Sequence, residues 1–123
     1  MNRITSGELR TKYKDVLDCD FECLDGWLPL IQSVLQVSQN RAQREGLTDF
    51  KFLQIKEKFG CLRMYHTGGS DYIAGVVDTA EYQSCKICEV CGAPGEFRVN
   101  HGWYQTLCDE HNQEPTDVSS SIQ

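Results

Sequence analysis

Four cysteine and histidine residues near the C-terminal end have the types and spacing of a metal site. Cys88 and Cys91 form a C-x-x-C pair followed by Gly92, and Cys108 and His111 form a second pair. Two thiolates three residues apart can bind one ion, and the glycine lets the backbone turn toward the sulfur atoms. The spacing of the two pairs is typical of structural zinc sites, in which four protein ligands close a tetrahedral shell. We therefore expect one structural Zn²⁺ held by these four side chains.

Other cysteines and histidines leave alternatives open. Cys85 lies three residues before Cys88, so it completes another C-x-x-C pair and could replace a ligand. His101 could also compete, although a histidine at the tip of a turn more often points to solvent. The candidates for a second site, which lack a comparable arrangement of pairs, are Cys19, Cys23, Cys61 and His66. Because the seven cysteines are odd in number and no export signal is evident, we expect metal binding rather than disulfides.

Residues that could support catalysis are sparse. A catalytic zinc keeps one position open for water, whereas four protein ligands close the shell. None of the three histidines belongs to an H-x-E or H-E-x-x-H motif. Cys61 with His66 could act as nucleophile and base, and Ser70 with His66 and Asp71 could form a hydrolytic set. Purely structural roles explain the same residues: a thiol in a hairpin strand, a histidine at a strand end and the N-cap of a helix. We therefore expect no enzyme, and a small enzyme that uses Cys61 and His66 is the alternative.

Two groups of charged residues are candidates for contact with a partner. The chain has a net charge of −6, and residues 85–123 contain two basic and six acidic residues. A nucleic-acid surface needs clustered lysine and arginine, so direct nucleic-acid binding by the zinc segment is disfavoured. The basic group, which could contact phosphate or an acidic partner, is Lys56, Lys58 and Arg63. The acidic group, which could steer the chain toward a basic protein surface, is Glu89, Glu96 and Glu110.

The N-terminal half predicts two helices. Thr5 begins a T-x-x-E capping box, and apolar residues at helical spacing continue it, which predicts a helix over residues 6–17. A second helix is expected over residues 27–44, with Pro29 in its first turn and Gly46 at the C-cap position. The acidic segment between the two helices is expected to be a connection.

The rest of the chain predicts two hairpins separated by a third helix. Residues 50–56 and 62–66 are rich in aromatic and branched side chains and flank Gly60, which can supply a positive φ. An N-cap at Ser70 and Asp71 then starts a helix that reaches Ser84. Two short strands, 95–99 and 103–107, should bring the ligand pairs together in a treble-clef or ribbon-like module, with a short helix after the second pair. The expected fold class is α+β. We expect a core of helices and a hairpin over residues 1–84, a zinc module over 85–112 and a disordered tail over 113–123.

No segment approaches the roughly 20 apolar residues that a membrane span requires. No apolar stretch of an export signal follows Met1. We therefore expect a soluble cytoplasmic protein without membrane contact.

Four short motifs resemble those of an uncharacterised family of small zinc-binding proteins from bacteria and their phages. They are G-W-L-P-L-I at residues 26–31, K-E-K-F-G-C-L-R at 56–63, C-E-V-C-G-A-P-G at 88–95 and L-C-D-E-H at 107–111. The resemblance implies a phage or prophage setting, in which small acidic proteins often act by binding host machinery. From this setting, together with the small size and acidic charge of the chain, we expect an inhibitor or modulator of a host nucleic-acid protein, such as a CRISPR or other defence nuclease, in the manner of an anti-CRISPR protein. A nucleic-acid-binding accessory protein that uses the basic hairpin is the second hypothesis.

Overall fold

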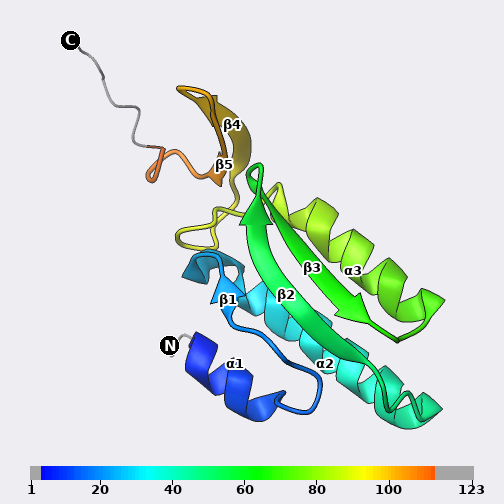
Figure 1. Cartoon of the computed structure of the whole chain (residues 1–123). Coiled ribbons are helices and arrows are strands. Elements are labelled where there is room, and N and C mark those ends of the chain that lie inside the picture. Colours follow the sequence, from blue (N-terminus) through cyan, green and yellow to red (C-terminus); the bar gives the residue numbers. More distant parts are fainter. Residues whose placement is uncertain (1–3, 113–123) are drawn as a thin grey trace.

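A three-stranded sheet carries helices on one face and a separate two-stranded hairpin at one end (Figure 1). The structure, a computed structural model, describes residues 4–112. Its elements are α1 (Ser6–Lys12), β1 (Phe21–Glu22), the 3₁₀ turn η1 (Asp25–Trp27), α2 (Leu28–Glu45), β2 (Lys51–Lys58), β3 (Cys61–Thr67), α3 (Asp71–Ser84), β4 (Glu96–Asn100) and β5 (Trp103–Leu107). The predicted α+β class is confirmed.

Helix α1 has the predicted capping box but ends earlier than predicted. The Thr5 hydroxyl accepts a hydrogen bond from Glu8 N at 3.1 Å, and the Glu8 carboxylate accepts one from Thr5 N at 2.8 Å. The prediction of a helix over 6–17 is wrong at its C-terminal end, because Phe52 N of β2 donates to the Val16 carbonyl at 2.8 Å. The backbone there is used by the sheet, so it cannot continue the helix.

The segment before α2 contains a strand that the sequence did not predict. Phe21 and Glu22 form β1, which pairs in parallel with Ile55 and Lys56 of β2. A two-residue strand is too short to show alternation, so only the tertiary pairing reveals it. Helix α2 follows close to its predicted bounds, with a proline in its first turn and the left-handed Gly46 at its C-cap.

The outer edge of β3 is closed by side chains of α3. Leu62 N donates to the Ser84 hydroxyl and Met64 N donates to the Glu81 carboxylate, both at 2.9 Å. An edge strand otherwise presents unpaired N–H groups on which another chain can pair. Helix α3 therefore both covers the sheet and satisfies two N–H groups of its edge.

The core lies between the sheet and helices α2 and α3, which run behind the β2–β3 hairpin in Figure 1. Ile55 and Leu62 are buried on this face of the sheet. Cross-strand pairs on the opposite face include Lys56 with Arg63. Because side chains alternate along a strand, one sheet face is core and the other presents cations.

Strand β4 is shifted by one residue from the predicted 95–99, and β5 has the predicted bounds of 103–107. The two-residue turn between them is His101–Gly102, with φ of 53° and 83°. Residues 108–111 form turns where a short helix was expected. The tail over 113–123 lies outside the described residues. Within residues 4–112, no helix combines the length and apolar character needed to cross a membrane.

Candidate metal centre

Cys88, Cys91, Cys108 and His111 come together beside the β4–β5 hairpin. One ligand atom from each residue lies within 4.8 Å of every other, so the set could hold one metal ion. The hairpin makes this possible, since its two strands return the second pair to the first. The predicted grouping of these four side chains is therefore confirmed.

Two separations between donor atoms are close to those around a single tetrahedral ion, and a third is shorter. The sulfur atoms of Cys91 and Cys108 are 3.7 Å apart, and Cys88 Sγ lies 3.8 Å from His111 Nδ1. Cys108 Sγ lies 3.2 Å from the same nitrogen. Zn–S bonds of about 2.3 Å in a tetrahedron place two sulfur atoms about 3.8 Å apart. The four donors thus need little movement to bind one ion.

The loop that carries the first pair is a tight knuckle. Gly92 N donates to the Cys88 carbonyl at 2.9 Å, and Cys88 N donates to the Ala93 carbonyl at 2.8 Å. Ala93 N donates to Cys91 Sγ at 3.5 Å. These bonds hold both sulfur atoms on the same side of the loop, as the C-x-x-C-G pattern predicts.

The surroundings of Cys88 favour its thiolate. Burial raises the pKa of the Cys88 thiol, but backbone N–H groups of Cys108, Cys91 and Val90 donate to the sulfur and lower its pKa to about 6. The thiolate is the form that binds a metal ion. The same N–H groups therefore favour the deprotonated form of Cys88 that could bind an ion.

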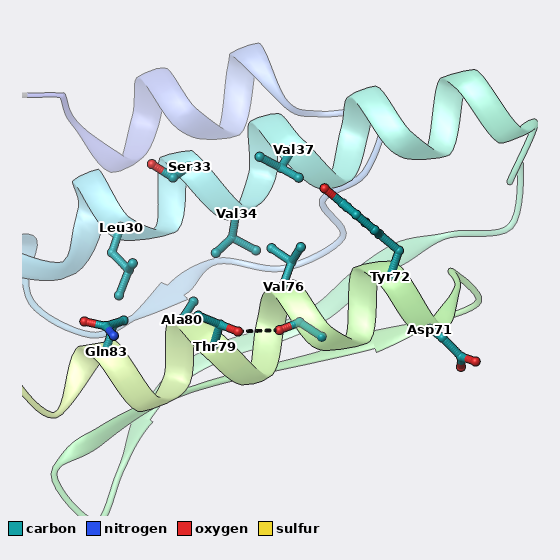
Figure 2. A pocket seen from close by; sticks show the side chains of 11 residues that line it. Leu30, Ser33, Val34, Val37, Asp71, Tyr72, Val76, Thr79, Ala80 and Gln83 are labelled. Carbon is teal, nitrogen blue, oxygen red and sulfur yellow. Dashed lines mark hydrogen bonds between the residues drawn. The ribbon is translucent and has the colours of Figure 1, made fainter.

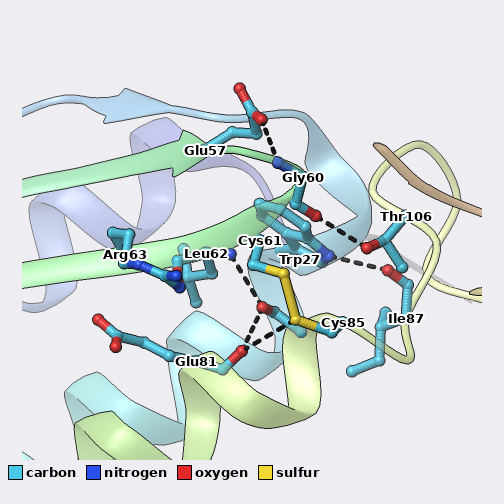
Figure 3. The surroundings of a disulfide bond; sticks show 11 residues. Trp27, Glu57, Gly60, Cys61, Leu62, Arg63, Glu81, Cys85, Ile87 and Thr106 are labelled. Atoms are coloured by element: carbon cyan, nitrogen blue, oxygen red, sulfur yellow. Dashed lines mark hydrogen bonds between the residues drawn. A yellow bond between two sulfur atoms is a disulfide. The ribbon is translucent and has the colours of Figure 1, made fainter. Parts of the chain in front are cut away.

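The knuckle is fixed to the core through the G-W segment before α2. The buried Trp27 donates its indole N–H to the Ile87 carbonyl at 2.9 Å (Figure 3). Gly26 N donates to the Glu89 carbonyl at 2.7 Å, and Leu24 N donates to the Glu89 carboxylate at 3.1 Å. The motif at residues 26–31 and the motif at residues 88–95, which are distant along the chain, thus lie against each other.

The K-E-K-F-G motif forms the turn between β2 and β3 and packs on β5. Phe59 and Gly60 have φ of 54° and 88°, and the Glu57 carboxylate accepts a hydrogen bond from Gly60 N at 2.7 Å. The Gly60 carbonyl accepts a hydrogen bond from the Thr106 hydroxyl at 2.8 Å (Figure 3). A Cβ on Gly60 would lie 2.9 Å from Gln105 N, so no larger residue fits without displacement. The turn therefore joins the sheet to the β4–β5 hairpin.

A disulfide between Cys61 and Cys85 lies next to this junction (Figure 3). The two Cα atoms are 5.3 Å apart, because Cys61 opens β3 and Cys85 caps α3. The prediction that disulfides are absent is wrong for this pair, and Cys85 does not replace a metal ligand. No spacing in the sequence indicates this pairing, since only the packing of β3 on α3 brings Cys61 and Cys85 together.

The structure separates Cys61 from His66. Cys61 is in the disulfide, and His66 lies near the other end of β3. His66 Nδ1 is 3.1 Å from the Gly68 carbonyl oxygen, and its ring packs against Phe50. Ser70 accepts a hydrogen bond from the backbone at the start of α3, as an N-cap does.

The other candidate ligands stay apart. In the part of the chain that the structure describes, the only cluster of at least three potential ligands is the Cys88 set, so Cys19 and Cys23 form no second site. Burial raises the pKa of the Cys23 thiol to about 12 and raises that of Cys19 above its ordinary value. His101 is exposed at the hairpin turn.

The charged candidates differ in exposure. Lys58 is exposed, while Lys56 and Arg63 are half-buried as a cross-strand pair. Glu96 and Glu110 are exposed, but Glu89 is only 8% exposed and its carboxylate bonds to the backbone. Burial also raises the pKa of the Glu89 carboxyl group. Glu89 is therefore part of the junction and cannot serve as a surface charge.

An exposed aromatic cluster, formed by Phe59, Phe97 and Tyr104, is a feature that the sequence did not predict. The rings of Phe97 and Tyr104 are stacked with centroids 5.6 Å apart, and Phe59 meets Tyr104 edge-on at 6.1 Å. The three residues line a shallow hollow of about 360 Å³. The cluster lies where the tip of the β2–β3 hairpin meets β4 and β5.

A second hollow, of about 590 Å³, lies between α2 and α3 (Figure 2). Its wall is mainly apolar, with Val34, Val37 and Val76 facing the gap in Figure 2. Tyr72 closes one end, and its ring packs under the Arg41 guanidinium at 3.6 Å. Asp71 is the one carboxylate in the wall, so the groove offers no pair of groups for acid–base chemistry.

Comparisons of the chain with protein-family models, with curated proteins and with solved structures find no match.

Proposed function

We propose that this chain is a non-enzymatic protein-binding module whose contact surface is stabilised by a structural Zn²⁺. The observation that carries the proposal is the closed donor set of Cys88, Cys91, Cys108 and His111, which adjoins an exposed hairpin. Three thiolates and one imidazole are a donor set that suits zinc. Because four protein atoms complete the shell, the ion has no open position for water or substrate. Its role is then to hold the hairpin on the core.

The face of the β4–β5 hairpin that carries Trp103 is the proposed protein contact. Cross-strand register and alternation place Trp103, Arg98 and Glu96 on one face. Trp103 is 75% exposed, and tryptophan is enriched among the residues that dominate binding energy. Arg98 forms an ion pair with Asp109 at 2.8 Å, which connects the hairpin to the turn that carries Cys108 and His111.

The acidic side chains near this face favour a basic partner. Glu96 and Glu110 are exposed, and ligating thiolates leave the centre itself negative. Nucleic-acid-handling proteins present basic surfaces, and opposite charge speeds encounter. Together with the resemblance to bacterial and phage proteins, this supports a modulator of host nucleic-acid machinery, of which a CRISPR or other defence nuclease is one form.

The test is a binding experiment on the zinc-loaded chain after nuclease treatment of a bacterial lysate. A captured protein is purified and titrated with wild type, with Trp103→Ala and with the double variant Glu96→Lys/Glu110→Lys. We expect a stoichiometric complex that Trp103→Ala weakens at least tenfold and that the charge reversal forms more slowly. Tyr82→Ala is the matched control, because Tyr82 is 64% exposed on α3.

The proposal fails if Trp103→Ala and Tyr82→Ala bind alike, or if the chain turns over a substrate at substoichiometric amounts. Removal of the metal should abolish capture by the wild type. If capture persisted without metal, the zinc would not support the contact surface.

A further inference from the structure

We propose that the chain also binds single-stranded nucleic acid, along an aromatic–basic strip that is separate from the Trp103 face. The strip runs from the aromatic cluster along the open face of the β2–β3 hairpin. It consists of Phe97, Tyr104, Phe59, Lys58, Lys56 and Arg63.

The aromatic end of the strip offers flat, solvent-facing rings. Phe97 and Tyr104 are 47% and 44% exposed and stack at an interplanar angle of 15°. Cross-strand register places them on the hairpin face opposite to Trp103. Successive bases stack on exposed rings of this kind in proteins that bind single strands.

Phe59 is held outward by a backbone that its side chain does not favour. Its φ of 54° is an uncommon conformation for a bulky residue, and the first position of such a two-residue turn normally holds Asn, Asp or Gly. The ring is 66% exposed, so burial in the core does not offset this strain. Strained residues of this kind collect at functional sites.

The basic end continues directly from Phe59. Lys58 Nζ lies 5.8 Å from the Phe59 ring centroid, and the pair Lys56–Arg63 follows on the same sheet face. In the described residues, none of these three cations takes part in an ion pair. Glu22 of β1 pairs with Lys56. One carboxylate beside the three cations Lys56, Lys58 and Arg63 leaves their net charge positive.

The chemistry of this strip fits an unpaired strand better than a duplex or an acidic protein. Rings reach the faces of bases only where the bases are unpaired, while the cations can each neutralise a phosphate. The hairpin extends about 10 Å from Phe59 to the cross-strand pair of Lys56 and Arg63, at roughly 3.3 Å per residue. An acidic peptide would pair with the cations but would leave the three rings without flat partners.

The experiment measures fluorescence anisotropy of labelled ten-nucleotide oligothymidine and oligouridine with the oxidised, zinc-loaded chain. Three phosphate contacts on a single strand predict a salt slope of about −2, or roughly 20-fold weaker binding at 200 mM than at 50 mM salt. Lys58→Ala/Phe59→Ala and Tyr104→Ala should each weaken binding about fivefold or more. The matched control is Tyr82→Ala/Lys86→Ala, an exposed cation–ring pair at 4.7 Å outside the strip, which should bind like wild type.

The inference is overturned if neither oligonucleotide binds, if the strip and control variants bind alike, or if a duplex or polyglutamate competes as well as the single strand. Thermal unfolding of each variant verifies that it is folded. The outcome is independent of the proposed protein contact: Trp103→Ala should leave oligonucleotide binding unchanged, and the strip variants should leave capture from a nuclease-treated lysate unchanged.

Discussion

Replacing Gly60 by alanine tests how the β2–β3 turn is fixed to the β4–β5 hairpin. Gly60 has a φ of 88°, and an added Cβ would lie 2.8 Å from Phe97 and 2.9 Å from the backbone of Tyr104 and Gln105. The left-handed conformation costs an L residue about 1–2 kcal/mol, and the smaller entropy of unfolded alanine offsets about 0.4–1 kcal/mol of this. Forcing atoms into a packed contact adds about 1–3 kcal/mol. We expect Gly60→Ala to lower the free energy of unfolding by about 2–4 kcal/mol.

Gly46→Ala provides the matched control for this substitution. Gly46 also has a positive φ, of 68°, but no atom lies within 4 Å of the position that a Cβ would take. It therefore isolates the backbone term, and we expect a loss of only about 1 kcal/mol or less. The difference between the two variants measures the contact of the turn with β5.

The assay is urea unfolding of the zinc-loaded, oxidised chain, followed by fluorescence of the buried Trp27. With an m value of about 1–2 kcal/mol/M, a loss of 3 kcal/mol lowers the midpoint by roughly 2 M. Equal midpoints for Gly60→Ala and Gly46→Ala would refute the packing of the turn on β5.

Three further predictions concern the same junction. Trp27→Phe removes the indole N–H that bonds to the Ile87 carbonyl, so unfolding free energy measured in urea should fall by about 1–3 kcal/mol. Cys61→Ser/Cys85→Ser opens a cross-link spanning 24 residues, and should cost about 3 kcal/mol relative to the oxidised wild type; no difference between oxidised and reduced wild type would contradict it. Against the effect of burial, backbone N–H groups of the folded chain lower the pKa of the Cys88 thiol from its ordinary value of 9.0 to about 6, and only the thiolate binds zinc, so zinc affinity should fall steeply as the pH drops through about 6. The zinc content of the chain after dialysis at pH values on either side of 6 measures that loss, and a zinc content that stays unchanged well below pH 6 would contradict it.

Features set by local sequence could be predicted. The capping box at Thr5 and the C-cap at Gly46 depend on residues a few positions apart, and both are present. The two ligand pairs belong to this class as well, since a hairpin with a short turn was enough to bring them together. The fold class and the grouping of the four candidate ligands therefore followed from patterns of short range.

Features set by tertiary contact could not be predicted. β1 exists because β2 offers it a free edge, and Cys61 meets Cys85 because α3 packs on β3. Glu89 has the sequence character of a surface charge, but the segment before α2 supplies a backbone donor and covers it. The aromatic cluster likewise joins two hairpins that are distant along the chain.

The most direct test of the central claim is the metal content and ligand set of the purified chain. Zinc would be quantified by mass spectrometry, and the coordination sphere would be read by X-ray absorption, for the wild type and for Cys108→Ser. We predict one zinc per chain with three sulfur neighbours and one nitrogen neighbour. We also predict that Cys108→Ser or a chelator unfolds the β4–β5 hairpin, because metal-binding energy there is folding energy. A wild-type chain that holds no zinc, or a hairpin whose amide exchange is unchanged when zinc is removed, would contradict it.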